Sequence, residues 1–282
     1  MRFQALWLLL SLCASTSFAQ TDSLSFEKVE WESKRLASGM HLRQAWFRHK
    51  SLFGANQFIA VIDIKPRSKN HFTIAYEPKV KRRTSEFGQQ AKAVAAINGT
   101  FFDVKNGGSV DYLRANGQVI NLNRPEKGGT RARHQQAAVV MKGNQLSIAK
   151  WDGTADWETR LDGQDVMLTG PLLLDQHHVA ALDSGVFNTA RHPRSVIGIT
   201  NKHHVLFITV DGRDANAAGM SLFELRKVMQ WLHCTDAINL DGGGSTTLWD
   251  KKHGVVNYPS DNKKWDHEGQ RKVANVILIK RN

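Results

Sequence analysis

The alternation of apolar and polar residues along the chain predicts a protein built largely from β-strands. Alternating residues over 40–47 (MHLRQAWF) predict a half-buried strand, and the apolar run over 57–65 (QFIAVIDIK) predicts a strand buried on both faces. Further strands are predicted before Asn98, in turn-linked pairs and near the C-terminus: 111–115 with 118–122, 136–141 with 145–150, 166–174, 195–200 with 204–212, and 273–281.

Two segments instead show the residue pattern of an α-helix. A helix is predicted from Thr84 to about Ala93, with Glu86 in its first turn. The segment 220–233 (MSLFELRKVMQWLH) gathers apolar residues on one side, and Ser221 is its candidate N-cap. The pattern shows no internal repeat and no low-complexity linker. It indicates an α+β fold, a single domain with a mixed, mostly antiparallel sheet and a few packed helices.

The first nineteen residues predict export. Arg2 gives a basic start, LWLLLSL an apolar core, and 17–19 (SFA) a cleavage site, so residues 1–19 are expected to be a signal peptide and 20–282 the mature domain. A lipoprotein acylated at Cys13 is the alternative, although Leu12 is bulky for that motif. No later run approaches the roughly 20 apolar residues of a transmembrane helix. We therefore expect a periplasmic or secreted bacterial protein without a transmembrane segment.

Composition narrows the partners. Lysine and arginine exceed the acids by twelve, which favours phosphorylated or otherwise anionic glycans as substrates, with simple solubility as the alternative. The basic residues are scattered rather than interleaved with aromatic residues, so no nucleic-acid partner is expected. Cys234 is the single cysteine of the mature chain and is predicted to be a small buried hydrophobe. The sequence leaves the oligomeric state open.

Four polar clusters follow or precede predicted strands, where loops present side chains on a rigid scaffold. They are 97–103 (INGTFFD), 190–198 (ARHPRSVIG), 210–220 (VDGRDANAAGM) and 238–247 (INLDGGGSTT). We expect all four to converge on one hollow. The polar, glycine-bearing segment 123–135 is expected to be a surface loop beside a site for a negatively charged ligand.

The glycine run is the most unusual of the four clusters. Its glycines allow positive φ and close approach, so the loop after Asp241 is predicted to form an anion-holding nest of backbone N–H groups; a plain turn capped by aspartate is the alternative. Arg213 is a candidate for a two-pronged phosphate contact, and Arg194 a candidate anchor before its strand. Glu224 lies in a first helical turn, where the helix dipole alone also explains an acid.

Metal and serine-hydrolase motifs are not found in the sequence. The histidines lack H-E-x-x-H spacing, and the G-x-S-x-G elbow does not occur. No metal site and no required cofactor are predicted. A hard divalent cation such as calcium, held by Asp103, Asp211 or Asp241, is left as an alternative.

In this order, the motifs INGTFFD, TGPLLL, RHPRSVIGI, VDGR with AGMSLFEL, and AINLDGGGSTT resemble those of the phosphodiester glycosidase family over about residues 90–280. The sequence departs from that pattern at Thr100 and at Ser195–Val196, which affects the expected shape of the pocket. The resemblance implies cleavage of a glycosidic bond whose leaving group is a phosphate. Matching positions imply a site made of Asn98, Asp103, Arg194, Asp211, Arg213, Glu224, Asn239, Asp241, Gly242, Gly243, Gly244, Ser245 and Thr246.

The chemistry assigns these residues expected roles. A carboxylate stabilises positive charge at the anomeric carbon, and a second can activate water. Asp241 or Glu224 is expected to be the base or nucleophile, with Asp211 and Asp103 as further catalytic candidates. Arg194 and Arg213 are expected to hold the phosphate, and Asn98 and Asn239 the sugar hydroxyls. Two alternatives stay open: an envelope polysaccharide-binding protein without activity, and a secreted metal-dependent phosphodiesterase that cuts the P–O bond.

Overall fold

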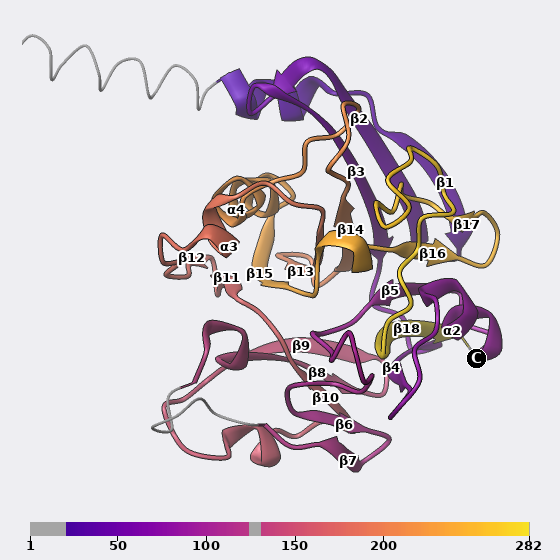
Figure 1. Cartoon of the computed structure of the whole chain (residues 1–282), viewed down its shortest axis with the longest axis vertical. Coiled ribbons are helices and arrows are strands. Elements are labelled where there is room, and N and C mark those ends of the chain that lie inside the picture. The colour runs from indigo at the N-terminus through magenta and orange to yellow at the C-terminus, as the bar shows by residue number, and fades with distance from the viewer. Residues whose placement is uncertain (1–20, 124–130, 282) are drawn as a thin grey trace, which may run out of the picture.

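The computed structural model of the chain describes residues 21–123 and 131–281, and strands dominate them (Figure 1). The predicted signal peptide, Cys13 and the central part of the predicted basic loop lie outside these residues. None of the helices described there is long and apolar enough to cross a membrane.

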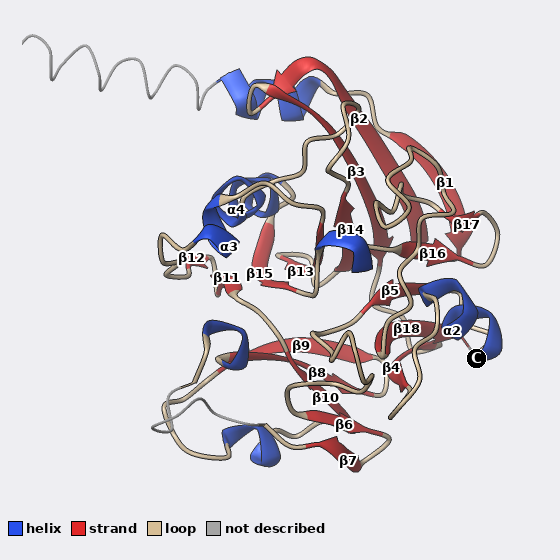
Figure 2. Cartoon of the chain, in the orientation of Figure 1, coloured by secondary structure: helices blue, strands red, loops and turns tan. Residues whose placement is uncertain are grey.

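The largest sheet has eight strands, which occupy the upper part of the molecule in Figures 1 and 2. Their order across the sheet is β1 (Glu32–Ala37), β2 (Met40–Leu52), β3 (Ala55–Ile64), β14 (Val205–Val210), β13 (Arg194–Thr200), β15 (Cys234–Asn239), β11 (Leu172–Asp175) and β12 (His178–Val179). Helix α4 (Leu222–Trp231) packs on β15 and β11, and the short α3 (Val186–Thr189) lies beside α4. Leu222, Leu225, Val228 and Met229 on the apolar side of α4 are fully buried, as its period predicts, whereas Phe223 is partly exposed.

Two five-stranded sheets complete the fold. The first has the order β17 (Gly254–Val255), β16 (Leu248–Asp250), β5 (Ala95–Asn98), β18 (Asn275–Arg281) and β4 (Asn70–Tyr76), and carries α2 (Thr84–Gln90). The second, lowest in Figure 2, has the order β7 (Gln118–Asn121), β6 (Leu113–Ala115), β10 (Asp165–Leu168), β8 (Ala137–Lys142) and β9 (Gln145–Lys150). Three 3₁₀ turns accompany the sheets: η1 (Arg133–Gln135), η2 (Trp157–Arg160) and η3 (Gly243–Ser245).

One apolar core joins the three sheets. Leu42 of β2, Ile277 of β18 and Met167 of β10 belong to the same buried cluster. A second cluster lies between the large sheet and α4, where Cys234 is buried as a free thiol, as the sequence predicted. Burial raises the pKa of that thiol to about 12, so it is not a nucleophile at neutral pH.

The predicted α+β class and mostly antiparallel pairing are confirmed, with two differences in detail. Three sheets form instead of one, and every strand pair among the described residues is antiparallel. The predicted hairpins, the two helices and the Ser221 cap are all present. Most strands missed from the sequence are short or exposed: five of the six residues of β1 are not buried, so its pattern carries little apolar signal. The sequence also missed β4, which has seven residues and buries four of them.

Antiparallel pairing decides where the loops meet. Arg194 at the start of β13 pairs with Val210 at the end of β14, and Val196 pairs with Asn239 at the end of β15. The segment before β13 therefore lies at the same end of the sheet's strands as the loops after β14 and β15. The clusters 190–198, 210–220 and 238–247 are brought together by this register.

Candidate active site

Asn98 joins the cluster 97–103 to the clusters 190–198 and 238–247. Its Nδ2 donates to the carbonyl of Asp241 at 2.7 Å, and its Oδ1 accepts from Ser195 Oγ at 2.6 Å and from the N–H of Thr247 at 3.1 Å. The side chain is fully buried. Asn98 therefore fixes the loop after β15 to the start of β13, and its carboxamide is bound to protein groups rather than directed at solvent.

The glycine run makes room for arginines. A Cβ on Gly243, whose φ is +61°, would lie 2.8 Å from Nη2 of Arg213, and a Cβ on Gly244 would lie 2.5 Å from Nη2 of Arg271. A Cβ on Gly242 would lie 2.7 Å from the carbonyl oxygen of Pro193 and 3.8 Å from the Cδ of Arg194. Side chains other than hydrogen at these positions would push the arginines and the 193–194 backbone away. We call the group Asp241, Arg194, Arg213, Arg271 and the three glycines the Asp241 site.

Four backbone N–H groups of this turn are paired within the protein rather than free to form the predicted nest. Gly242 N–H donates to Asp241 Oδ1 at 3.0 Å, and Gly243 N–H donates to the carbonyl of Pro193 at 2.8 Å. The N–H groups of Ser245 and Thr246 close the η3 turn at 3.2 Å each. The expectation of an anion-holding nest at these four amides is wrong, because they are already paired. Positive charge at the site comes from guanidinium groups instead.

Asp241 is the partly exposed carboxylate of the site. The surrounding protein buries it enough to raise its pKa to about 6, while the Gly242 N–H and the charge of Arg271 favour the ionised form. The Ser245 hydroxyl also opposes the rise by its proximity, although it has no hydrogen bond of good geometry within the described residues. Asp241 is therefore largely ionised at neutral pH but close to its proton-transfer range.

Arg194 is a buried cation without a carboxylate partner in residues 21–123 and 131–281. It is 1% exposed, and its Nε and Nη2 donate to the carbonyls of Met220, Phe187 and Ala190 at 2.8–3.0 Å. Burial, with a smaller effect from Arg213, lowers its pKa to about 10, so it stays charged at neutral pH. Its Nη1 forms no hydrogen bond to any described residue. A buried charge without a counter-ion is costly and is well suited to bind an anion.

Arg213 adds a second unpaired cation. It is exposed, has no ion pair with any described residue, and adopts φ +65°, a conformation that costs a non-glycine residue free energy. Burial lowers the pKa of His192, and the charges of Arg194 and Arg213 lower it further. The two arginines and His192 are thus near enough to repel one another as cations. An anionic ligand would relieve that repulsion.

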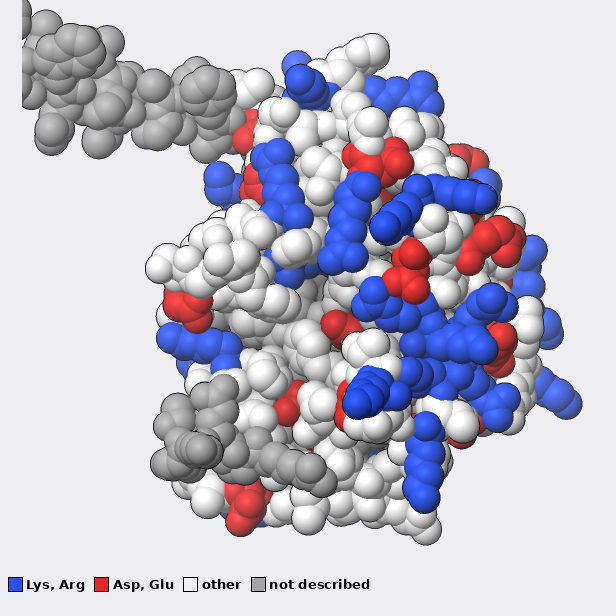
Figure 3. All heavy atoms as spheres, in the orientation of Figure 1, with Lys and Arg blue, Asp and Glu red and all other residues white. Residues whose placement is uncertain are grey.

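Arg271 is a site residue that the sequence did not single out. Its Nε and Nη2 bind Asp261 Oδ1 at 2.9 and 2.6 Å, which holds its guanidinium over Gly244, near Asp241. Nothing but its charge marks it in the sequence, since it belongs to none of the four clusters. Figure 3 shows this face of the molecule with its surface receding near the centre and basic residues gathered to the right of that hollow.

Asp211 and Glu224 are held by protein groups. Asp211 is 1% exposed and accepts from Asn257 Nδ2 at 2.7 Å and from the N–H of Tyr258 at 2.8 Å; burial raises its pKa to about 7. Glu224 forms the capping box of α4 with Ser221 and an ion pair with Arg191 at 2.5 Å. Both support loops that border the Asp241 site, and their predicted catalytic roles stay predictions.

Asp103 lies in a different environment. It accepts from the N–H groups of Lys105 and Asn106 at 2.8 and 2.9 Å, and the Asn106 hydrogen bonds lower its pKa. It lines a hollow of about 540 Å³ together with Asp111 and His134, and no residue of the Asp241 site lines that hollow. The structure therefore does not bring Asp103 together with Arg194, Arg213 and Asp241.

The loop after β15 carries buried polar atoms without partners among the described residues. They are Asn239 Oδ1, Ser245 Oγ, Thr246 Oγ1 and Thr247 Oγ1. Asn239 Nδ2, by contrast, donates to the carbonyls of Gly170 and Leu240 at 3.0 and 2.6 Å. A buried polar atom left unpaired costs about 1–3 kcal/mol, so one at the end of β15 and three in the turn after it indicate that water or a polar ligand belongs there.

The side chains at the Asp241 site do not resemble a metal site. Within the described ranges, no cluster of three or more His, Cys, Asp or Glu side chains is arranged to hold a metal ion. The donor set around Asp241 is one carboxylate among cations, which suits an anion better than a cation.

The motifs around this site match a known family model, described as phosphodiester glycosidase, over residues 91–280. The chain belongs to the phosphodiester glycosidase family. That family comprises hydrolases that act on glycosyl phosphodiesters, so membership agrees with a carboxylate placed among arginines.

Solved structures support the same fold at low identity. The catalytic domain of zebrafish N-acetylglucosamine-1-phosphodiester alpha-N-acetylglucosaminidase, auto-inhibited by its pro-peptide, is 18% identical with a TM-score of 0.67, over 90% of this chain and 88% of that one. A hypothetical protein from Synechocystis is 15% identical with a TM-score of 0.65, over 90% of this chain and 64% of that one. These likenesses show the fold.

A Bacillus subtilis protein, the SPbeta prophage-derived uncharacterized protein YomE, is 36% identical over 56 residues, which are 20% of this chain. The chain matches only 9% of the length of that curated relative and 64% of the Synechocystis chain. These matches therefore assign no activity, substrate or partner to this protein.

Proposed function

We propose that this protein hydrolyses a sugar-1-phosphodiester at the glycosidic C–O bond. Water adds its oxygen to the anomeric carbon, the C–O electron pair leaves with the phosphate, and the products are a free sugar and a phosphomonoester. The observation that carries the proposal is Arg194, a buried guanidinium without a carboxylate partner in the described chain, whose side chain passes beside Gly242, the residue that follows the partly exposed Asp241.

Asp241 is the proposed base or nucleophile. Bond cleavage builds positive charge at the anomeric carbon, and a nearby carboxylate stabilises it. With its pKa raised to about 6, Asp241 is ionised at neutral pH and still basic enough to accept a proton from water. Since the ionised form is required, kcat/KM is expected to fall as the pH drops below about 6.

Arg194, Arg213 and Arg271 are the proposed binding groups for the phosphodiester. The guanidinium groups of Arg213 and Arg271 lie at Gly243 and Gly244, and the side chain of Arg194 passes beside Gly242. These arginines supply positive charge in a turn where four of the backbone amides are already paired. A phosphate is a good leaving group once its charge is held. The site therefore needs less acid assistance than one that expels an alcohol.

The proposal extends to location and substrate source. The signal-peptide pattern over residues 1–19 supports export to the periplasm or the medium, and the net positive charge supports an envelope or extracellular glycan as the natural substrate. Fractionation of a producing cell tests the first point: protein retained in the cytoplasm with residues 1–19 uncleaved would contradict it.

The deciding experiment incubates the protein with a panel of sugar-1-phosphodiesters in ¹⁸O-labelled water, followed by mass analysis of both products. We expect the label at the anomeric hydroxyl of the released sugar and none in the phosphate. Label in the phosphate would identify P–O cleavage by a phosphodiesterase, and a parallel reaction in EDTA would show whether a metal ion is needed. Binding without turnover of any panel member would favour a polysaccharide-binding protein.

A further inference from the structure

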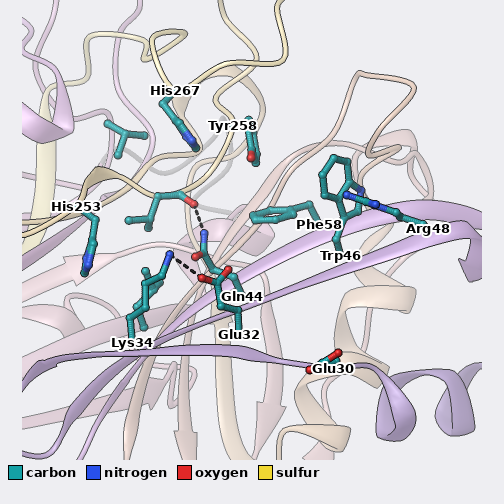
Figure 4. A pocket seen from close by; sticks show the side chains of 13 residues that line it. Glu30, Glu32, Lys34, Gln44, Trp46, Arg48, Phe58, His253, Tyr258 and His267 are labelled. Atoms are coloured by element: carbon teal, nitrogen blue, oxygen red, sulfur yellow. Dashed lines mark hydrogen bonds and ion pairs between the residues drawn. The ribbon is translucent and has the colours of Figure 1, made fainter.

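A hollow of about 600 Å³ lies between strands β1 and β2 and the segment 253–267 (Figure 4). This volume lies within the range of about 300–1,000 Å³ that is usual for small-ligand pockets. We call it the Trp46 hollow; its lining includes Glu32, Gln44, Trp46, Arg48, Tyr258 and His267. None of these residues belongs to the Asp241 site.

One wall of the hollow is a rigid aromatic stack. Tyr258 stacks on Trp265 with ring centroids 4.0 Å apart and on His267 at 4.4 Å. Trp46 carries the guanidinium of Arg48 over its ring at 4.1 Å and packs edge-on against Phe58. Rings held in this way lose little conformational entropy when a ligand binds. Because Trp265 and His267 stack on Tyr258 and Arg48 covers one face of Trp46, Tyr258 presents its hydroxyl to a ligand rather than a ring face.

The rest of the lining offers hydrogen bonds of both kinds. In Figure 4, Tyr258 and His267 point toward the centre from one side, and Gln44 and Glu32 lie opposite them. His267 Nδ1 lies 2.7 Å from the carbonyl of Asn257, so Nδ1 carries the proton and Nε2 is left as an acceptor. The Tyr258 hydroxyl has no hydrogen bond to any described residue. Hydroxyl-rich ligands use such mixed donors and acceptors.

The charges of the Trp46 hollow balance. Glu32 pairs with Lys34 at 2.8 Å, and Glu30 and Arg48 contribute one further charge of each sign. This contrasts with the arginine excess at the Asp241 site. A phosphate gains no net attraction from two carboxylates and two cations, whereas an uncharged sugar needs none.

The hollow and the Asp241 site share supporting segments. The segment 257–271 supplies Tyr258 and His267 to the hollow and Arg271 to the Asp241 site. Trp46 Nε1 donates to the carbonyl of Asn216 at 3.1 Å, in the loop that carries Arg213. A saccharide bound in the hollow would therefore contact the elements that hold two of the three site arginines.

We propose that the Trp46 hollow is a second saccharide-binding site, for uncharged sugar units of a glycan and distinct from the Asp241 site. It retains a polymer at the protein through neutral units, and it binds them whether or not the Asp241 site is catalytic. The proposal goes beyond the hydrolytic activity and does not depend on it.

The test is ligand-observed NMR with cellotetraose, maltotetraose and chitotetraose as probes, each at about 5 mM, a concentration that detects weak sites with dissociation constants near 1 mM. We expect saturation transfer from the wild-type protein to at least one probe. Trp46→Ala should reduce that transfer at least tenfold.

Trp151→Ala is the matched control, because Trp151 also donates its indole N–H to a backbone carbonyl and also carries an arginine over its ring. It should leave the transfer unchanged. Should Trp46→Ala fail to fold, Tyr258→Phe keeps the stack and removes one hydroxyl, and it should weaken binding by about threefold to tenfold. Asp241→Asn should bind the probe as the wild type does.

Three results would overturn the proposal: no transfer to any of the three probes, full transfer in Trp46→Ala or Tyr258→Phe, or loss of transfer in Asp241→Asn. The last result would place the sugar at the Asp241 site. Failure of hydrolysis with intact probe binding would contradict the proposed activity while leaving the second site in place.

Discussion

The Asp241 site and the Trp46 hollow lie on shared segments but are built for different ligands. The first places one carboxylate among three arginines, two of them without ion pairs in the described chain. The second balances its charges and holds aromatic rings in a fixed stack. Excess charge selects an anion, whereas balanced charge with aromatic surface selects an uncharged polyol. The contrast predicts that each site can be removed without the other.

The electrostatic difference also has a structural cause. Three consecutive glycines let the guanidinium groups approach the turn after Asp241, so charge density is set by missing side chains. At the Trp46 hollow, large side chains form the wall and fix one another through ring contacts. Ligand binding at the Asp241 site should therefore be sensitive to side-chain atoms added at its glycines, and binding at the Trp46 hollow to the truncation of its aromatic side chains.

The largest expected effect is that of Asp241→Asn on turnover. This change removes the ionisable group at the anomeric carbon, and kcat should fall at least about 10³-fold, in the range of a lost base or nucleophile. Glu224→Gln is the control, since Glu224 is engaged by Ser221 and Arg191, and it should cost less than about tenfold. Initial rates on a cleaved sugar-1-phosphodiester measure both. Equal losses in the two variants would remove the distinction between these carboxylates.

The next effect concerns the unpaired charge of Arg194. Arg194→Met should lower kcat/KM about 10²-fold, because the phosphate loses a desolvated guanidinium. Its free energy of unfolding should change by less than about 2 kcal/mol, since three carbonyls lose donors while a buried charge without a counter-ion is relieved. Arg191→Met, in the same segment but paired with Glu224, should change kcat/KM less than threefold. Equal losses of kcat/KM in Arg194→Met and Arg191→Met would show that the effect comes from the geometry of this segment and not from the unpaired charge of Arg194.

The sequence predicted the convergence of these residues well. Asn98, Arg194 and Asp241 follow or precede strands whose apolar runs are unmistakable, and antiparallel register brings such ends together. It predicted the outcome of the glycine run poorly. Whether a glycine turn offers amides or space for side chains depends on which partners approach it, and Arg271 comes from a segment with no regular pattern.

Glu224 and the Trp46 hollow show two further limits. The spacing of Ser221 and Glu224 is a capping-box signature, which favours a structural role for Glu224. Its position in the family motif instead favours a catalytic role. The Trp46 hollow unites β2 with residues more than two hundred positions later, such as Tyr258 and His267. No local pattern reports such a pairing, because long-range packing decides it.

A third prediction uses the stability of the folded chain against pH. An aspartate in the unfolded chain ionises near pH 4, whereas folded Asp241 ionises near pH 6. Between these values the folded protein holds more protons, so this carboxyl lowers the free energy of unfolding as pH rises. Asp241→Asn should therefore be more stable than wild type by about 1–3 kcal/mol at pH 8 and nearly equal to it at pH 4. Urea unfolding at both pH values measures this, and a difference independent of pH would contradict it.

The smallest expected effect tests whether missing side chains shape the Asp241 site. Gly243 and Gly143 both adopt φ +61°, but a Cβ at Gly143 meets nothing within 4 Å, whereas a Cβ at Gly243 meets the Arg213 guanidinium. Alanine at either position should lower stability by about 1 kcal/mol, since both pay the same backbone strain. Only Gly243→Ala displaces Arg213, so only this variant should raise KM, by about threefold to tenfold, with little change in kcat. Because the Trp46 hollow does not include Gly243, its binding of neutral oligosaccharides should be equal in both variants.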